Sequence, residues 1–348
     1  MGLHPVEGVA GAPWERPLAG TVEKLVVESE LLAGNPLGDP ARRPLYVYVP
    51  PGADSVELPS VYVLQGYGGQ LDMWSSRPDF ELNMFERIDA MFAAGECPPA
   101  VIVFVDAWTR YGGSQFLNSP STGPYQDYVC DEVVPFVDAH YPTASSRDRR
   151  GVSGKSSGGY GAMVLSMMRP DVWGAFASHA GDALFECSLQ PEFAAVARTL
   201  RDEFNGSFDV FLEHFRSLQR FDFKRDGPPL ITYGMACVYT PDPARPGDGL
   251  IPFEISTGRL IDELWERWLE FDPVRMAPGH ADALRSMRRI YLDAGNRDEF
   301  FLDLGARAFA DELDKLGVDY SLELYDGTHA GSQYRYPGAI RELVLALS

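Results

Sequence analysis

The stretch that decides the fold is 148–168, DRRGVSGKSSGGYGAMVLSMM. Residues 149–153 are short and strand-like, and residues 154–158 then spell Gly-Lys-Ser-Ser-Gly, the pattern G-x-S-x-G. The apolar run 160–168, rich in Ala, Met and Leu, predicts a buried helix. A strand, a tight turn and a helix in this order predict that Ser156 is a nucleophile held at a sharp elbow.

The glycines of the pentapeptide fit such a turn. Residues two before and two after the nucleophile pass close to backbone, so Gly154 and Gly158 avoid a clash that a Cβ would cause. The following helix points N–H groups, including that of Ser157, to where an oxyanion would form. A phosphate-binding loop is excluded because it needs a glycine at position 149, which is Arg149. A Gly/Ser-rich turn without chemistry is the remaining alternative.

The composition of the chain excludes several classes of function. The 348 residues suit one large α/β domain or two small ones, and the apolar fraction of 45% is ordinary for a globular protein. A net charge of −20 argues against nucleic acid or an anionic membrane as partner. The first twenty residues lack an apolar core, no apolar run reaches membrane length, and the four cysteines are scattered. These features predict a cytoplasmic protein without metal or cofactor, and they leave a Cys187–Cys237 pair open.

A second glycine-rich turn follows the short buried strand 61–64. It reads Gln65-Gly66-Tyr67-Gly68-Gly69 and lets backbone approach a ligand closely. Hydrolases with this arrangement take one oxyanion donor from this loop, so the N–H of Tyr67 is the candidate beside that of Ser157. Gln65 and Gly66 are candidate substrate contacts, and an ordinary strand-to-helix turn is the alternative.

Two further loops carry candidate substrate contacts. The apolar run 101–105 suits a central parallel strand, and Trp108 lies on the loop that follows it. Its ring could line a pocket or pack beneath the loop. The strand expected at 173–178 leads into His179 and Asp182, where the histidine could bind substrate or be a hydrogen-bonded structural residue.

The remaining pattern completes an α/β chain. Residues 1–20 are rich in Pro and Gly and are expected to be irregular, and residues 21–348 to form a single domain. The β-α rhythm breaks over about 183–286, where helical spacing is separated by turns at 226–229 and 240–252, so this segment is expected to be a cap over the site. Strands are expected at 22–32, 45–49, 289–293 and 320–325, and helices at 80–94, 127–140, 302–316 and 340–347.

A base and an acid follow the serine in chain order. Asp298 lies just past one expected strand, and His329 lies past the next, with one helix between them. Both therefore reach the sheet edge at which Ser156 lies, where active sites of open α/β sheets form. A serine hydroxyl needs such a base, and the base needs an orienting group. Asp182 is a rival for the acid.

With these motifs in place, the chain resembles the family of α/β hydrolases called "Putative esterase", which includes S-formylglutathione hydrolase, enterochelin esterases, feruloyl esterase domains and mycolyltransferases. The resemblance implies an α/β-hydrolase fold, with a mostly parallel sheet covered by helices on both faces. It also implies Ser156 as nucleophile, Asp298 as acid, His329 as base, and the N–H groups of Tyr67 and Ser157 as oxyanion hole. The matching stretches are YVYVPPG at 46–52, VYVLQGYGG at 61–69, GKSSGGYGAM at 154–163, YLDAGNRDEF at 291–300 and YDGTH at 325–329.

We therefore expect a serine carboxylesterase that acts on a small-molecule ester as a monomer or homodimer. A thioesterase or acyltransferase would use the same three residues with another leaving group or acceptor. A catalytically silent binding protein of the same fold is the alternative outside the enzymes. The sequence does not identify the acyl group or the alcohol.

Overall fold

A computed structural model describes residues 17–53, 57–77 and 81–348. Its centre is an eight-stranded sheet with strand order β1-β2-β4-β3-β7-β8-β9-β10. The first two strands pair antiparallel, β2 pairs antiparallel with β4, and all other neighbours are parallel. The strands are β1 (Thr21–Glu28), β2 (Arg42–Val49), β3 (Ser60–Leu64), β4 (Val101–Val105), β7 (Arg150–Lys155), β8 (Ala175–His179), β9 (Arg289–Gly295) and β10 (Ser321–Tyr325).

Burial explains the strand sequences. Every residue of β3, β4 and β8 is buried, as continuous apolar runs predict for parallel strands covered on both faces. The antiparallel edge strand β1 is instead mostly exposed, with two partly buried residues and one buried residue, Val27. A short separate hairpin, β5 (Asn118–Ser119) with β6 (Gly123–Pro124), lies in the loop after β4. The predicted α/β architecture with a mostly parallel sheet is confirmed.

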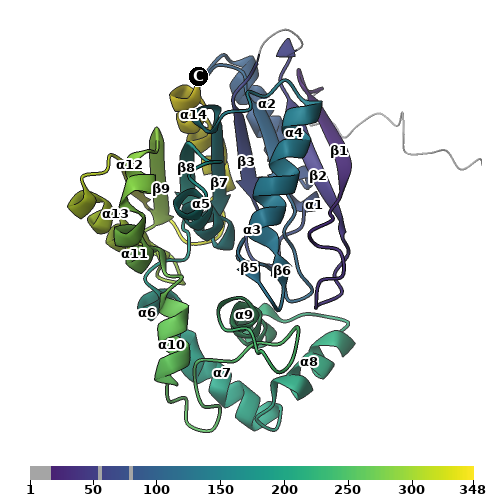
Figure 1. The fold of residues 1–348 in the computed structure, drawn as a ribbon, viewed down its shortest axis with the longest axis vertical. Helices are drawn as coiled ribbons and strands as arrows, with labels where there is room; N and C mark the ends of the chain where they lie inside the picture. The colour runs from purple at the N-terminus through teal and green to yellow at the C-terminus, as the bar shows by residue number, and fades with distance from the viewer. Residues whose placement is uncertain (1–16, 54–56, 78–80) are drawn as a thin grey trace, which may run out of the picture.

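Helices cover both faces of the sheet (Figure 1). One apolar cluster joins side chains of β3 and β4 to helices near the chain's start and end, α2 and α14. The other cluster joins the opposite side chains of these strands to α4, α5 and α13. The helices of these two layers are α1 (Asp72–Ser75), α2 (Met84–Ala93), α3 (Tyr125–Asp127), α4 (Val134–His140), α5 (Ser157–Met168), α13 (Leu302–Leu316) and α14 (Tyr336–Leu347).

Helix ends show why some boundaries were predictable. The expected stop at Gly317 is confirmed, since this residue has the left-handed conformation that closes α13. Helix α2 begins after Asn83, whose side chain forms a capping box with Glu86. The expected start at Phe80 lies outside the described residues. The helix expected at 127–140 is interrupted by a π-helical segment, Tyr128–Val133.

The segment between β8 and β9 consists of helices in two groups. Helices α7 to α10 gather at one end of the molecule (Figure 1), whereas α11 and α12 pack against α13 and α5 of the helical layer. That the segment 183–286 forms a cap over the site stays a prediction. The helices are α6 (Phe185–Ser188), α7 (Gln190–Glu203), α8 (Phe208–Ser217), α9 (Phe223–Tyr239), α10 (Asp262–Leu269), α11 (Pro273–Met276) and α12 (Ala281–Arg285).

The turn predicted at 226–229 is wrong, because these residues lie inside α9. Pro228 and Pro229 fit a helical φ but cannot donate the usual hydrogen bonds to the carbonyls of Lys224 and Arg225. Those two residues are exposed, so water can satisfy the carbonyls. Gly227 has no Cβ to clash with the proline ring that follows it.

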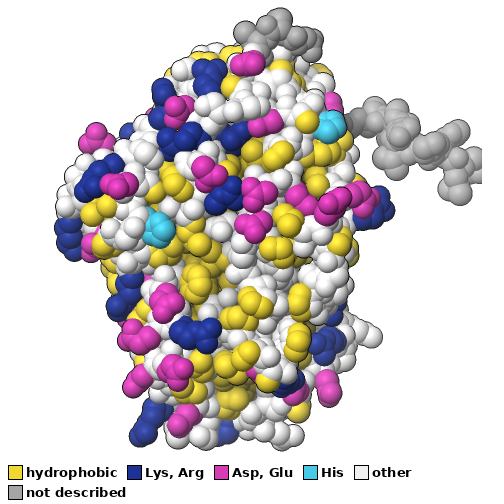
Figure 2. All heavy atoms as spheres, in the orientation of Figure 1, with side chains coloured by type: hydrophobic (Ala, Val, Ile, Leu, Met, Phe, Trp, Pro, Cys, Tyr) yellow, Lys and Arg dark blue, Asp and Glu magenta, His cyan; other side chains and the backbone are white. Residues whose placement is uncertain are grey.

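The surface and the chain's start complete the description. Acidic and basic side chains are interspersed on the face drawn in Figure 2, with hydrophobic side chains gathered between them over the lower half. Of the segment expected to be irregular, residues 1–16 lie outside the described part, and residues 17–20 form neither strand nor helix. No helix in the described ranges has both the length and the apolar character needed to span a membrane.

Candidate active site

Ser156 occupies a strained turn between β7 and α5. Its φ of 58° and ψ of −126° lie in a region that residues with a side chain rarely adopt. Such a conformation costs about 1–3 kcal/mol and persists only where the surroundings impose it. The N–H of Ser156 donates to the carbonyl of His179 on the neighbouring strand, at 2.9 Å. The backbone therefore has the geometry expected of an elbow that presents a side chain at the sheet edge.

Two glycines make this turn sterically feasible. A Cβ on Gly158 would lie 2.4 Å from the carbonyl oxygen of Leu64, and one on Gly154 would lie 2.4 Å from backbone atoms of Gly158. Both distances are far below van der Waals contact and involve backbone, which cannot rotate away. The spacing G-x-S-x-G is therefore required by the packing of β7, the elbow and β3.

His329 and Asp298 form a direct pair. Nδ1 of His329 lies 2.8 Å from Oδ2 of Asp298, while Oδ1 of Asp298 accepts from the N–H of Phe300 at 2.9 Å. The carboxylate thereby holds the proton on Nδ1 and leaves Nε2 as the basic nitrogen. Glu299 adds a second anchor, because its carboxylate accepts from the N–H of His329 at 2.8 Å.

The serine and the histidine face one cavity. Ser156 and His329 both line a cavity of about 330 Å³. Within the described residues, neither Ser156 Oγ nor His329 Nε2 has a hydrogen-bond partner. The two groups therefore share an open space without a direct hydrogen bond, and catalytic hydrogen bonds often shorten only when substrate binds.

The glycine-rich turn after β3 lies against the elbow. A Cβ on Gly66 would come within 3.3 Å of the Lys155 carbonyl and 3.6 Å of the Ser156 Cβ. In the described part of the chain, the N–H groups of Tyr67 and Ser157 have no hydrogen-bond acceptor. Two free N–H groups beside the nucleophile are the donors that an oxyanion hole needs, and these two remain a prediction.

The Tyr67 side chain holds this turn in place. Its ring packs on Gly112 and Gly113, where a Cβ would lie 2.5 Å and 3.1 Å from ring atoms. Its hydroxyl donates to the carbonyl of Tyr111 and lies 3.4 Å from the carbonyl of Leu230 in α9. The residue proposed to supply an oxyanion donor is therefore packed between the core and the inserted helices.

The cavity has apolar walls and few charges. Its apolar lining comes mainly from the inserted helices and includes Leu189, Phe193, Ile231, Met235 and Trp268. The helical spacing of this segment indicated buried faces, but it could not tell which buried side chains meet the nucleophile. The sequence analysis also did not predict the role of Glu299, because no sequence pattern marks a carboxylate that accepts from a single backbone N–H.

Two charged side chains flank the nucleophile inside the cavity. Lys155 and Asp182 both line it. Burial lowers the pKa of Lys155, although the carboxylates of Asp298 and Glu299 act in the opposite direction. Burial raises the pKa of Asp182 to about 6. Asp182 bonds to Ser157 and Gln115 and not to His329, so the histidine's partner is Asp298.

Of the candidate substrate contacts, Gly66 and Asp182 line the cavity, while Gln65, His179 and Trp108 do not. Gln65 is buried. His179 is also buried, and its Nδ1 lies 2.9 Å from Oδ1 of Asp293, as in a structural histidine. These three side chains do not line the cavity, so their contact with substrate stays a prediction that the cavity does not support.

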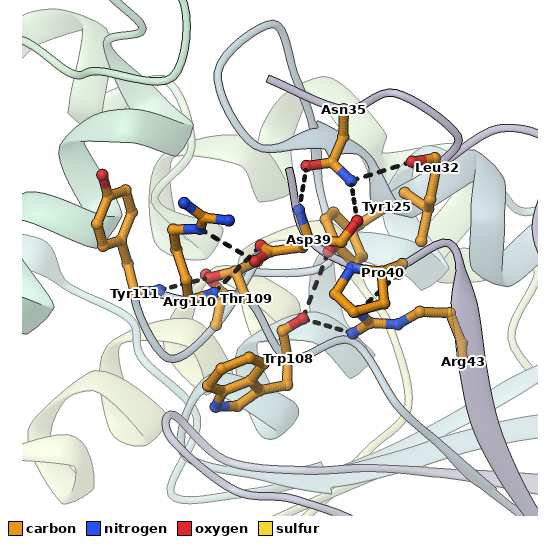
Figure 3. A network of polar contacts seen from close by, with 11 residues as sticks. Leu32, Asn35, Asp39, Pro40, Arg43, Trp108, Thr109, Arg110, Tyr111 and Tyr125 are labelled. Atoms are coloured by element: carbon orange, nitrogen blue, oxygen red, sulfur yellow. Dashed lines mark hydrogen bonds and ion pairs between the residues drawn. The ribbon is translucent and has the colours of Figure 1, made fainter. Parts of the chain in front are cut away.

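Trp108 instead belongs to the network that anchors the loop after β4 (Figure 3). Its carbonyl accepts from the Arg43 guanidinium and lies 3.4 Å from the Tyr125 hydroxyl. Asp39 binds the next part of the loop by accepting from the Arg110 backbone and side chain. In the structure, these contacts therefore fix the loop backbone that supports Tyr67.

Residues 40–336 match the family described as "Putative esterase". The chain belongs to this esterase family. Membership fits the α/β-hydrolase fold and places the protein in an enzyme class, the esterases. This is the family that the five sequence stretches resemble, so the predicted resemblance is confirmed.

Individual relatives match only in part. An iron(III) enterobactin esterase of Dickeya dadantii is 32% identical over 101 residues, which cover 29% of this chain and 23% of that protein. An endo-1,4-beta-xylanase/feruloyl esterase of Xylanibacter ruminicola is 23% identical over 134 residues, which cover 37% of this chain and 18% of that protein. The chain thus matches less than a quarter of the length of either relative.

Solved structures agree on the fold. A ferulic acid esterase superposes with a TM-score of 0.60 at 17% identity, covering 95% of this chain and all of that chain, 100%. An S-formylglutathione hydrolase from Agrobacterium tumefaciens gives a TM-score of 0.56 at 16% identity, covering 96% of this chain and 98% of that chain. At such identities the likeness concerns the fold and does not carry over a substrate.

Proposed function

We propose that the protein is a serine carboxylesterase that hydrolyses small carboxylic esters through an acyl-enzyme. The observation that carries the proposal is the strained Ser156 in one cavity with His329, whose Nδ1 is bonded to Asp298. Family membership supports ester hydrolysis as the reaction class. The apolar walls suit an uncharged ester with an apolar acyl or alcohol part.

The proposed reaction has two halves. His329 Nε2 takes the proton of Ser156 Oγ as this oxygen attacks the ester carbonyl carbon, and the N–H groups of Tyr67 and Ser157 hold the resulting oxyanion. Collapse of the tetrahedral intermediate breaks the bond to the alcohol oxygen, which receives the proton from His329. Water then attacks the acyl-enzyme with the same base, and the acid and free Ser156 are released.

Asp298 acts through the histidine. Its carboxylate fixes the tautomer that leaves Nε2 free and stabilises the imidazolium formed in both halves. Because Oδ1 of Asp298 is held by the N–H of Phe300, the carboxylate is oriented before substrate arrives. No proton needs to reach Asp298 itself.

Hydrolysis of p-nitrophenyl esters of increasing acyl length tests the proposal, with the Ser156→Ala variant beside the wild type. We expect activity that falls about 10⁴-fold or more in the variant, because the nucleophile is lost. The acyl-length profile would then report the room that the cavity offers. Undiminished turnover in folded Ser156→Ala protein would refute the proposal.

A further inference from the structure

Asp182 differs from every other buried aspartate that the structure describes. It is 7% exposed, and both of its hydrogen bonds go to Oδ2 from neutral donors at 3.4 Å, Gln115 Nε2 and Ser157 Oγ. The other buried aspartates bond to cations, an imidazole or backbone N–H groups: Asp39 to Arg110, Asp89 to Ala19 and Gly20, Asp106 to Arg43, Asp226 to Arg225, Asp272 to Leu184, Phe185 and Val274, Asp293 to His179 and Arg335, and Asp298 to His329.

The unbonded oxygen of Asp182 belongs to a residue of the cavity wall. Within the described chain, Oδ1 has no hydrogen-bond donor, and Asp182 is among the residues that line the cavity. No lysine or arginine forms an ion pair with it in the described ranges. Lys155 also lines the cavity, but the carboxylates that act to raise its pKa are those of Asp298, Glu299 and Asp293. Oδ1 is not one of the fully buried side-chain atoms that lack a partner in the described chain, so it is open to the cavity, where a donor on a ligand can replace water.

Asp182 lies close to the proposed reacting centre. It lies within hydrogen-bonding distance of Ser157, whose N–H is a proposed oxyanion donor, and it lines the same cavity as Ser156 and His329. The surrounding wall is apolar, with Phe193, Met235 and Trp268. A ligand that fills this space would place an apolar body against the wall and a donor against the carboxylate.

We infer that Asp182 is a specificity-determining residue that binds a hydrogen-bond donor, a hydroxyl or an ammonium group, on an otherwise apolar ester. The inference rests on the proposed esterase function. The folded protein already bears the desolvation of the carboxylate, so a donor on the substrate gains a charge-assisted hydrogen bond. An analogue with a methyl group in the same place leaves the acceptor unmet and is discriminated against.

One set of matched esters tests this. The probes are p-nitrophenyl 3-arylpropanoates with a para methyl, hydroxymethyl or aminomethyl group, and benzyl acetates with the same three substituents for the alcohol side. One of the two series, acyl or alcohol, places its substituent against Asp182. In that series, we expect kcat/KM about 10- to 100-fold higher for a donor-bearing ester than for its methyl analogue. The hydroxymethyl and aminomethyl arms tell which donor the site prefers.

The Asp182→Asn variant supplies the decisive comparison. It keeps the shape and one acceptor oxygen but removes the charge, so the preference for a donor-bearing ester over its methyl analogue should collapse to within about 3-fold. Glu192→Gln is the matched control, since Glu192 also lines the cavity but is exposed, where water screens it. It should leave the preference intact. An equal fall for all three esters in Asp182→Asn would mean a structural role and would overturn the inference.

Binding separates this inference from the proposed function. Ser156→Ala protein can bind the same esters without attacking them, and calorimetry gives their dissociation constants. Donor-bearing esters should bind about 10-fold tighter or more than the methyl ester, and Asp182→Asn in the same background should remove the difference. Equal binding of the three esters overturns the inference, whereas loss of all turnover in wild-type protein overturns the esterase proposal alone.

Discussion

Replacing Asp182 by Asn should stabilise the protein, and increasingly so as the pH rises. Burial raises the pKa of Asp182 from its ordinary 3.8 to about 6, so the fold disfavours the ionised form. Stability linked to this group is fully present below pH 4 and is lost as pH rises through the interval between these two values. Asparagine does not ionise and avoids the loss.

The magnitude follows from the pKa difference. A shift from 3.8 to about 6, at about 1.4 kcal/mol for each pH unit, amounts to about 3 kcal/mol above pH 7. At pH 4 the same treatment leaves less than about 1 kcal/mol, because the carboxyl is almost fully protonated in the folded state and only about half ionised in the unfolded state. Asparagine can still accept from Ser157 and Gln115, so no buried donor loses its partner.

Urea unfolding of both proteins at pH 4 and pH 8 measures the difference. The free energy of unfolding of Asp182→Asn should exceed that of the wild type by about 3 kcal/mol at pH 8 and by far less at pH 4. Asp311→Asn, an exposed residue on α13, is the control and should show no such pH dependence. A variant that is less stable than wild type at pH 8 would refute the assignment of an under-satisfied carboxylate.

Three further changes test the turn and the histidine loop. Gly158→Ala should destabilise the fold by roughly 3 kcal/mol, because its Cβ would lie 2.4 Å from a backbone oxygen; an unchanged melting temperature would contradict the packing. Gly338→Ala is the matched control, because Gly338 is an exposed residue of α14 with nothing within 4 Å of the new Cβ, and it should stabilise by about 0.5 kcal/mol in urea titration. Glu299→Ala should lower kcat about 10-fold by freeing the loop that carries His329, while Glu299→Gln, which keeps an acceptor, should stay close to wild type; equal kcat values for the two variants would argue against this anchor.

The placement of the three candidate catalytic residues could be predicted because chain order and strand endings constrain it. Ser156 sits in a pentapeptide whose glycines have a steric reason, and Asp298 and His329 each follow a strand that ends at the same sheet edge. Parallel strands bring their carboxyl ends together wherever the helices between them pack. The observed bond between His329 and Asp298 follows from this topology.

The inserted helices could not be predicted to the same depth. The Pro228-Pro229 pair indicated a turn, but tertiary packing holds it within α9 and places Ile231 and Met235 in the cavity wall. The spacing of Phe193 and Trp268 predicts buried helix faces without saying what buries them. Likewise, Asp182 was a candidate by position alone, and its unmet acceptor is visible only in three dimensions.

The measurement that tests the central claim most directly is labelling by a fluorophosphonate probe, followed by mass spectrometry of the labelled peptide. The account predicts a label on Ser156 in the wild type, and a labelling rate reduced about 100-fold or more in His329→Gln, because the proton of Oγ would lack its base. Folded wild-type protein that takes up no label, or that is labelled equally fast in both forms, would contradict a histidine-activated serine.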